Sequence, residues 1–256
     1  MSAYRIGVLD HGFVELRNLS GPTRRLHNGP PDLQGNDFME AMLEPREFDA
    51  DDVDPANAAR MSFDQMDSGR TREQDLKLCD YLMRNWHNSP FEMVEAWIEM
   101  KLPIFVARQF VRHRTVSINE VSGRYVKLPA EWYIPEFVGG KPVNAKQGQT
   151  DNLPNEIQRD FKFMLDTNCR NSYQAYEWAL EQGVAAEHAR MHLHLNHYTH
   201  WLWKQDLHNL MHFLRLRDHS HAQVEAQLFA KAIDVLLRAQ LPNTMSLYDK
   251  YRRLEQ

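Results

Sequence analysis

The chain is organised around one polar stretch, Arg112-His113-Arg114-Thr115-Val116-Ser117-Ile118-Asn119-Glu120-Val121-Ser122-Gly123-Arg124-Tyr125. It holds three arginines within fourteen residues and directly follows an apolar segment. Clustered cations repel one another unless an anion neutralises them, and the guanidinium group is suited to bidentate binding of phosphate or carboxylate. A solvated basic loop is the simpler interpretation, but valine and isoleucine alternate with the polar residues, as in the wall of a pocket. The stretch therefore predicts a site for a phosphate-bearing ligand.

The composition is that of an ordinary globular protein. With 256 residues, 43% of them apolar, the chain can bury a full core, and one elaborated domain is as compatible with this length as two. A net charge of −5 argues against general nucleic-acid binding, so we expect no nucleic-acid partner. Cys79 and Cys169 fit no disulfide framework, which is typical of a reducing compartment. Without an apolar signal region or a run of about 18 apolar residues, a cytoplasmic protein that does not enter a membrane is expected.

The residues before this stretch predict a strand followed by a helix. Apolar and polar residues alternate from Val94 to Leu102, which is the period of a half-exposed strand. Pro103 is suited to a first helical position, and a helix is predicted from Ile104 to about Arg114. Arg108 and Arg112 then lie one turn apart on it, as do Gln109 and His113. The first half of the polar stretch is thus expected at a helix end and the second half in the loop beyond.

Periodicity and breakers predict the remaining elements. In the first half of the chain they are two strands over 4–18 about a turn at Asp10-His11-Gly12, and a helix from Thr71 with Gln74 completing a capping box. In the second half, a long helix follows Pro154 and closes at Gly183, and a helix over 185–193 carries Arg190. A break is predicted over 196–203, followed by helices over 206–215 and 220–239, the last stopped by Pro242. Insertions are expected near 20–55 and 138–156, and no linker divides the chain, so residues 1–256 are interpreted as a single domain. The order of elements favours an α+β fold.

Two further segments carry candidate chemistry. Four histidines occur within His192–His200, and on a continuous helix His194, His197 and His200 would share roughly one face, so metal binding is a hypothesis. No nearby carboxylate or cysteine completes a ligand set, and histidines in a polar interior or a cofactor pocket are the favoured interpretation; no metal site is predicted. Arg217 ends a predicted helix, where a cation is favourable with or without a ligand. The sequence holds no P-loop, GxGxxG, HExxH or GxSxG motif.

Taken together, these residues resemble the flavin-dependent thymidylate synthase family. The signature is Arg112-His113-Arg114, seven residues, then Ser122, and apart from 20–55 and about 138–156 the likeness covers most of the chain. Ser117, 119–120 and 123–125 extend the signature, and the other matching segments are 8–16, 58–60 with 62–63, His87 with 90–92, 103–109, 133–135, 189–190, 213–214 with 216–217, and 220–223 with Glu225.

This resemblance implies an α+β fold with an antiparallel-rich sheet packed with several helices, and a homotetramer with active sites at subunit interfaces. It implies an enzyme that transfers a one-carbon unit from methylenetetrahydrofolate to C5 of dUMP, with FAD as cofactor and NADPH as reductant, to make dTMP. Arg217 would stabilise a uracil ring ionised at N3, Ser122 would position or polarise dUMP, and His87 would lie by the flavin and the folate.

The other site residues follow from the same resemblance. Those implied for dUMP are Gln109, Phe110, Val111, Arg112, Glu120, Val121, Ser122, Gly123, Arg124, Arg190 and Arg217. Those implied for FAD are Ser89, Arg112, His113, Arg114, Glu120, Asp206, His208 and His212.

The chain departs from many relatives at three positions. His194 stands where many have proline, and Asp206-Leu207-His208 stands where many have Asn-x-Arg. The second departure adds a negative charge and removes a fixed positive one near the expected flavin. Two alternatives therefore stay open: a variant of the same family that forms 5-hydroxymethyl-dUMP, and a non-catalytic dUMP-binding module.

Overall fold

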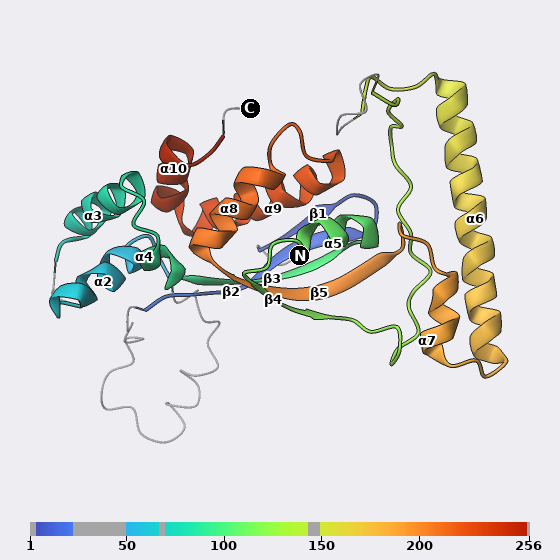
Figure 1. Ribbon diagram of the computed structural model, residues 1–256, viewed down its shortest axis with the longest axis horizontal. Helices are drawn as coiled ribbons and strands as arrows, with labels where there is room; N and C mark the ends of the chain where they lie inside the picture. Colours follow the sequence, from blue (N-terminus) through green and yellow to red (C-terminus); the bar gives the residue numbers. More distant parts are fainter. Residues whose placement is uncertain (1–3, 23–49, 67–69, 143–148, 255–256) are drawn as a thin grey trace.

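The fold is built on one antiparallel sheet with helices on one of its faces. A computed structural model describes residues 4–22, 50–66, 70–142 and 149–254. Its sheet has five strands in the order β1-β2-β3-β5-β4, and every neighbouring pair is antiparallel. Figure 1 shows this sheet crossing the middle of the molecule with helices above it. The predicted α+β class is confirmed; the predicted insertion near 20–55 lies largely outside the described residues.

Three strands form where the sequence predicts them. β1 (Arg5–Val8) and β2 (Gly12–Ser20) make the hairpin about Asp10, and β3 (Glu95–Pro103) pairs with β2. Alternate residues of β3 point into the core, where Ala96, Ile98, Met100 and Leu102 are at most 1% exposed. The period of two therefore reflects one buried and one open face of the sheet.

Two strands were not predicted. The expected break over 196–203 is wrong, because β5 (Tyr198–Asp206) runs through it and lies between β3 and β4. The loop expected after the arginine cluster is also wrong over β4 (Val116–Glu120), an edge strand. Trp201 and Trp203 of β5 are buried, while His200 beside them is exposed. The histidine run is therefore partly strand, and the shared helical face proposed for it does not exist.

Helices α5 (Ile104–Phe110), α8 (Leu207–Arg217) and α9 (Val224–Gln240) cover the sheet. α5 ends before Arg112, so the predicted extension to Arg114 is wrong, and α9 begins at Val224, later than the expected Ser220. Pro242 does not merely stop α9; it begins a further helix, α10 (Pro242–Tyr251), which was missed.

The remaining helices flank this core at its two ends. At one end lie α2 (Asp54–Arg60), a 3₁₀ turn (Met61–Phe63), α3 (Arg72–Arg84) and α4 (Ser89–Glu92), and the capping box of Thr71 and Gln74 is confirmed. At the other end, α6 (Asn155–Glu181) stands apart from the sheet with α7 (Ala186–Ala189) and a 3₁₀ turn (Arg190–His192). Gly183 follows α6 with φ of +78°, as the predicted stop requires.

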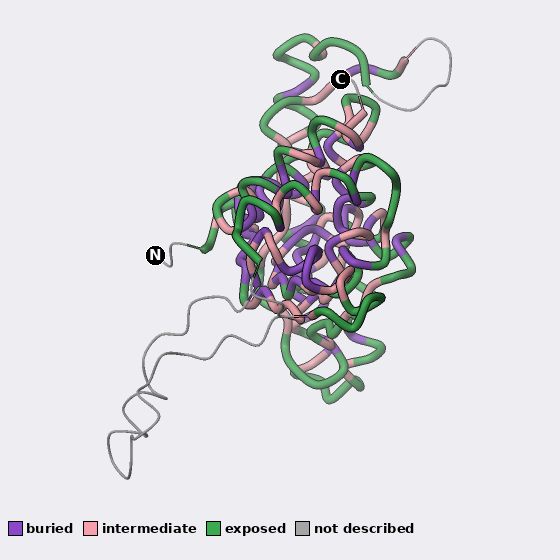
Figure 2. The backbone as a smooth tube through the Cα atoms, turned by 90° about the vertical axis from the view of Figure 1, so that its left-hand side faces the viewer, coloured by how far each residue is buried: buried purple, intermediate pink, exposed green. Residues whose placement is uncertain are grey.

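The core is one large apolar cluster with a small satellite. Buried purple segments concentrate in the middle of the molecule in Figure 2, and the ends are mostly green or pink. The satellite joins α6 to α7 through Tyr173, Tyr176, Ala179 and Ala189. No helix among the described residues has the length and apolar character needed to cross a membrane.

Candidate active site

The arginine cluster opens onto a large cleft among the described residues. This cleft has a volume of about 1370 Å³ and lies where the end of α5 meets the connection between α8 and α9. Arg108, Arg112 and Arg217 line it, together with Gln109 and Gln223. Two segments far apart in the sequence, the predicted stretch and the predicted Arg217 helix end, therefore come together.

Arg217 is held by the backbone and by a histidine of the predicted stretch. Its Nη2 donates to the carbonyl of Gln109 at 3.0 Å, and its Nε donates to His113 Nε2 at 3.1 Å. The Gln109 carbonyl belongs to the last turn of α5, where helix carbonyls lack helical partners. His113 must present an unprotonated Nε2 to accept this bond.

The electrostatics around His113 agree with that geometry. Burial lowers the pKa of His113 to about 4, and the neighbouring charges of Arg217 and His212 contribute to the same shift. The imidazole is therefore neutral near pH 7, and it orients the Arg217 guanidinium without adding a second cation. Gln109 also donates to Gln223 Oε1 at 2.6 Å, which ties α5 to the start of α9.

Three arginines at and after the end of α5 have no acidic partner among the described residues. Within the described ranges, no carboxylate lies in ion-pair distance of Arg108, Arg112 or Arg114, although Arg124, Arg238 and others on the chain are paired. Positively charged side chains that lie near one another and have no acidic partner favour the binding of an anionic ligand.

The far end of β4 forms a second group of the predicted residues. Thr199 donates to the Glu120 carboxylate, and the Arg124 amide donates to Ser122 Oγ at 3.3 Å. Arg124 pairs with Glu187 at 3.2 Å. Gly123 is buried beside Arg190, since a Cβ built there would lie 3.4 Å from Arg190 Cδ and 3.0 Å from Leu128 Cδ1. The glycine thus permits the close approach of Leu128 to the turn, with Arg190 in ordinary contact beside it.

The predicted flavin residues on α8 form a third group near α4. Asp206 is the N-cap of α8 and accepts from the Asn209 amide at 2.9 Å. An aspartate caps a helix as well as an asparagine and its charge is favourable at the positive end of the helix, so Asp206 has a structural role at this position. Burial lowers the pKa of His208, and Arg252 lowers it further. His212, one turn on, has its ring centroid 6.3 Å from that of His113.

His87 lies in the turn that joins α3 to α4, and Ser89 follows this turn. His87 is exposed, and its ring stacks on Tyr81 with centroids 5.8 Å apart. Ser89 lies at the start of α4 and is exposed, whereas Phe110 is fully buried, so a ligand could reach Phe110 only through its backbone. Val111 and Val121 are exposed at the ends of α5 and β4. The predicted residues therefore gather in three groups on one subunit, and the first and third groups meet where the rings of His113 and His212 lie 6.3 Å apart.

Sequence reasoning missed several residues that contact these groups. Gln223 was part of the resemblance but not of the expected site, and its bond to Gln109 depends on a contact between distant elements. Arg252 and Arg253 follow the last helix and matched no motif. The only signal for them in the sequence is that two arginines stand side by side near the end of a chain with a negative net charge.

The histidine run points in different directions. His194 Nε2 lies 2.7 Å from Ser172 Oγ on α6, and His200 Nε2 lies 2.7 Å from Glu99 Oε1 on the open sheet face. His197 is buried and stacks on Tyr173 with centroids 6.4 Å apart. Across the described ranges, no group of three or more histidine, cysteine or acidic residues could hold a metal ion.

His197 gives the fold a pH dependence that can be measured. Burial lowers the pKa of His197 to about 4, below the roughly 6.5 of a histidine in an unfolded chain. Between these values the unfolded state binds more protons, so the free energy of unfolding falls as the pH falls through this window. We expect the free energy of unfolding of His197→Phe to fall less than that of the unmodified chain when the pH is lowered from about 7 to about 5. Urea titrations at each pH measure both values. His194→Phe, at an exposed histidine, is the control, and equal losses for His197→Phe and the unmodified chain would contradict the assignment.

The chain is similar to several known proteins. The family model described as "Thymidylate synthase complementing protein" matches residues 46–243. The flavin-dependent thymidylate synthase of Rickettsia bellii is 36% identical, covering 96% of this chain and 79% of the relative, and that of Ruegeria pomeroyi is 40% identical, covering 96% and 73%. The solved UMP/dUMP methylase PolB from Streptomyces cacaoi, bound with 5-Br dUMP, superposes with a TM-score of 0.76 at 26% identity, covering 98% of this chain and 100% of PolB. The predicted membership of an enzyme family is confirmed: this chain belongs to the flavin-dependent thymidylate synthases.

Proposed function

We propose that this enzyme transfers a one-carbon unit from methylenetetrahydrofolate to C5 of dUMP and forms dTMP, with FAD bound and NADPH as reductant. The family name supports a flavin-dependent synthesis of thymidylate, and PolB is described as a UMP/dUMP methylase bound with a dUMP analogue. Residue by residue, the motif of the family is intact over 112–125 in this sequence.

The observation that carries the proposal is the set of guanidinium groups around the cleft. Arg108, Arg112 and Arg217 line one space and, within the described ranges, none of them pairs with a carboxylate. A nucleoside monophosphate brings the phosphate that such groups bind bidentately. The cleft volume of about 1370 Å³ is ample for a nucleotide, since common small-molecule sites have roughly 300–1,000 Å³.

The residues proposed for FAD are chemically suited to that cofactor, and they belong to more than one of the three groups. A dinucleotide cofactor carries a pyrophosphate, for which the guanidinium groups of Arg112 and Arg114 are suitable partners. His113, Glu120, Ser89 and the α8 residues Asp206, His208 and His212 complete the proposed set by resemblance. FAD, when bound, supplies the carrier for reducing equivalents, and the protein supplies orientation and charge.

The role proposed for Arg217 follows from its fixed charge. Uracil C5 is a weak nucleophile unless electron density moves into the ring, and a cation beside N3 and O2 stabilises the charge that this creates. Its bonds to His113 and the Gln109 carbonyl fix the guanidinium before any ligand arrives. Ser122 is proposed to orient dUMP, and its Oγ already accepts from the Arg124 amide.

A homotetramer with shared sites is part of the proposal. The three groups of site residues lie on different parts of one subunit, and a second subunit could bring complementary groups together. The outer side of α6 also carries an apolar stripe of exposed residues at helical spacing. Its members are Ile157, Phe161, Met164 and Trp178, which are 42–60% exposed. Burying such a stripe against another copy is the usual way to stabilise it.

Mass spectrometry of the nucleotide product is the direct test. With FAD, methylenetetrahydrofolate, NADPH and dUMP, we expect a product heavier than dUMP by one CH₂ group over many turnovers. A product that also carries an added oxygen atom would instead identify the hydroxymethyl-forming alternative. Binding of dUMP without any new nucleotide would identify the non-catalytic module. Protein that shows no flavin spectrum after FAD addition and no dUMP-dependent product would contradict the proposal altogether.

A further inference from the structure

Two adjacent arginines at the end of α10 contact both sides of the proposed site. Arg252 and Arg253 directly follow this helix, and the family match ends earlier, at residue 243. Both are largely buried: Arg252 is 6% exposed, and the Arg253 side chain is 21% exposed. Buried guanidinium groups cost free energy unless they are fully bonded, so their partners identify what they stabilise.

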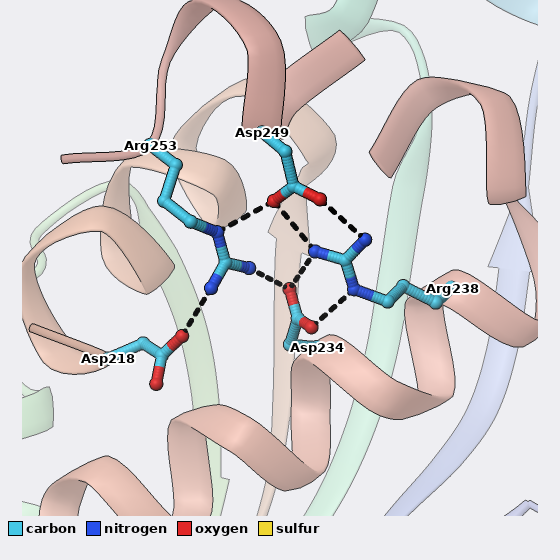
Figure 3. A network of polar contacts seen from close by, with 5 residues as sticks. All are labelled: Asp218, Asp234, Arg238, Asp249 and Arg253. Atoms are coloured by element: carbon cyan, nitrogen blue, oxygen red, sulfur yellow. Dashed lines mark hydrogen bonds and ion pairs between the residues drawn. The ribbon is translucent and has the colours of Figure 1, made fainter. Parts of the chain in front are cut away.

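Arg253 lies at the centre of a network with three aspartates. Its Nη1 donates to Asp218 at 2.6 Å, its Nη2 donates to Asp234 at 2.5 Å, and its Nε lies 2.7 Å from Asp249. Figure 3 shows Arg253 between these carboxylates, with Arg238 bonded to Asp234 and Asp249 on the other side. Of the two arginines in this network, Arg253 is the one that reaches Asp218.

Asp218 directly follows Arg217 and caps α8. Its amide donates to the Leu214 carbonyl at 2.9 Å, and its side chain is 7% exposed. The Asp218–Arg253 bond therefore fixes the chain at the residue next to Arg217, at the point where α8 ends. Arg217 depends on this end, because its guanidinium must reach back to the Gln109 carbonyl and His113.

Arg252 fixes the turn that carries His87. Its Nη2 donates to the Met83 carbonyl at 3.0 Å and its Nη1 to Asn88 Oδ1 at 3.0 Å, so it joins the last turn of α3 to the residue before α4. Its guanidinium also lies 3.8 Å from the ring centroid of Trp86, a residue with φ of +60°. A bulky side chain in this left-handed conformation needs support from its surroundings.

From these contacts we propose that Arg252 and Arg253 are positioning residues that hold the His87 turn and the Arg217 helix end in one fixed relation. This inference rests on the proposed function for the roles of His87 and Arg217. The inference goes beyond the proposed function because it assigns a structural role to the residues that follow α10. Neither arginine needs to touch a ligand, because each acts through a neighbour of a site residue.

Three variants separate positioning from stability. Asp218→Ala removes the bond to the Arg217 helix end, yet leaves Arg253 with Asp234 and Asp249, so no buried cation loses all its partners. Arg252→Gln removes the bonds to the His87 turn. Arg238→Gln is the matched control, since it breaks bonds to Asp234 and Asp249 in the same network without touching Asp218. We expect Asp218→Ala and Arg252→Gln to lower kcat about ten- to hundredfold, as displaced active-site groups do, and Arg238→Gln to leave kcat unchanged in the folded fraction.

Hydrogen exchange gives a readout that requires no turnover. Exchange should accelerate near 215–222 in Asp218→Ala and near 84–92 in Arg252→Gln, with the other segment unchanged in each. If the unmodified enzyme made no dTMP, the proposed function would fail, while these exchange patterns would still decide whether the two arginines hold the two segments. The positioning role is overturned if both variants keep the exchange and kcat of the unmodified chain, or if Arg238→Gln lowers kcat as much as Asp218→Ala.

Discussion

Replacing Arg217 by alanine is expected to lower turnover by about a hundred- to a thousandfold, the usual effect of removing one preorganised donor from an active site. The guanidinium is fixed by bonds of 3.0 and 3.1 Å before substrate binds, so its charge needs little reorganisation during the reaction. The fold should lose only about 1–3 kcal/mol, because the variant leaves the Gln109 carbonyl and His113 Nε2 without this donor. Steady-state kinetics at saturating dUMP and urea unfolding measure the two effects separately.

Arg215→Ala is the matched control for this prediction. Arg215 lies two residues earlier on α8 and is not part of the cleft lining. Its loss should change stability by roughly 0.5 kcal/mol or less and leave the rate unaffected. If Arg217→Ala unfolded at a much lower temperature while its folded fraction kept the full rate, the ligand role of Arg217 would be wrong.

The sequence was informative wherever a pattern belonged to a single element. The hairpin about Asp10, the alternation of β3 and the capping box at Thr71 each depend on neighbouring residues, and all three formed as predicted. The arginine stretch and Arg217 were also singled out before the structure joined them at one cleft. Charge and residue type therefore pointed to the cleft without knowledge of the fold.

The errors at β4 and β5 share a physical cause. In each strand, alternate residues are buried on one face of the sheet, but conspicuous polar residues on the other face make this alternation hard to recognise in the sequence. In β5, the buried Trp201 and Trp203 alternate with His200, Leu202 and Lys204, and the histidines suggested a helical ligand set. In β4, the alternating Val116 and Ile118 indicated a pocket wall, whereas they pack on the core as part of an edge strand. Both segments become strands because β5 pairs with β3 and β4 pairs with β5. Such pairing joins residues that are distant in the sequence, so the local pattern does not reveal it.

The contacts of the last residues could not be predicted for the same reason. Arg253 meets Asp218 and Asp234 only because α10 returns across α9 after Pro242. A proline after an apolar helix predicts a stop, but proline is equally suited to the first turn of a helix. Missing α10 therefore removed the residues that hold the site from consideration.

Phe110→Ala is expected to destabilise the fold by about 3–5 kcal/mol, the typical cost of truncating a fully buried phenylalanine. The ring has no exposed surface and meets Phe213, Trp203 and Phe229 edge-on, with centroids 4.8, 6.1 and 6.4 Å away. Since whole domains are stable by about 5–15 kcal/mol, this loss is a large fraction of the total. Urea unfolding measures it directly.

This variant separates the structural part of the arginine stretch from its chemical part. Phe110 ends α5, so its ring anchors Gln109 on one side and Arg112 and His113 on the other to the sheet. Phe110→Ala should therefore weaken dUMP binding as a consequence of lost packing, and a low temperature that restores folding should restore most of the binding. Phe137→Ala, at a phenylalanine that is 59% exposed, is the control and should cost roughly 0.5 kcal/mol or less. A Phe110→Ala protein as stable as this control, but unable to bind dUMP, would mean that the side chain serves the ligand and not the core.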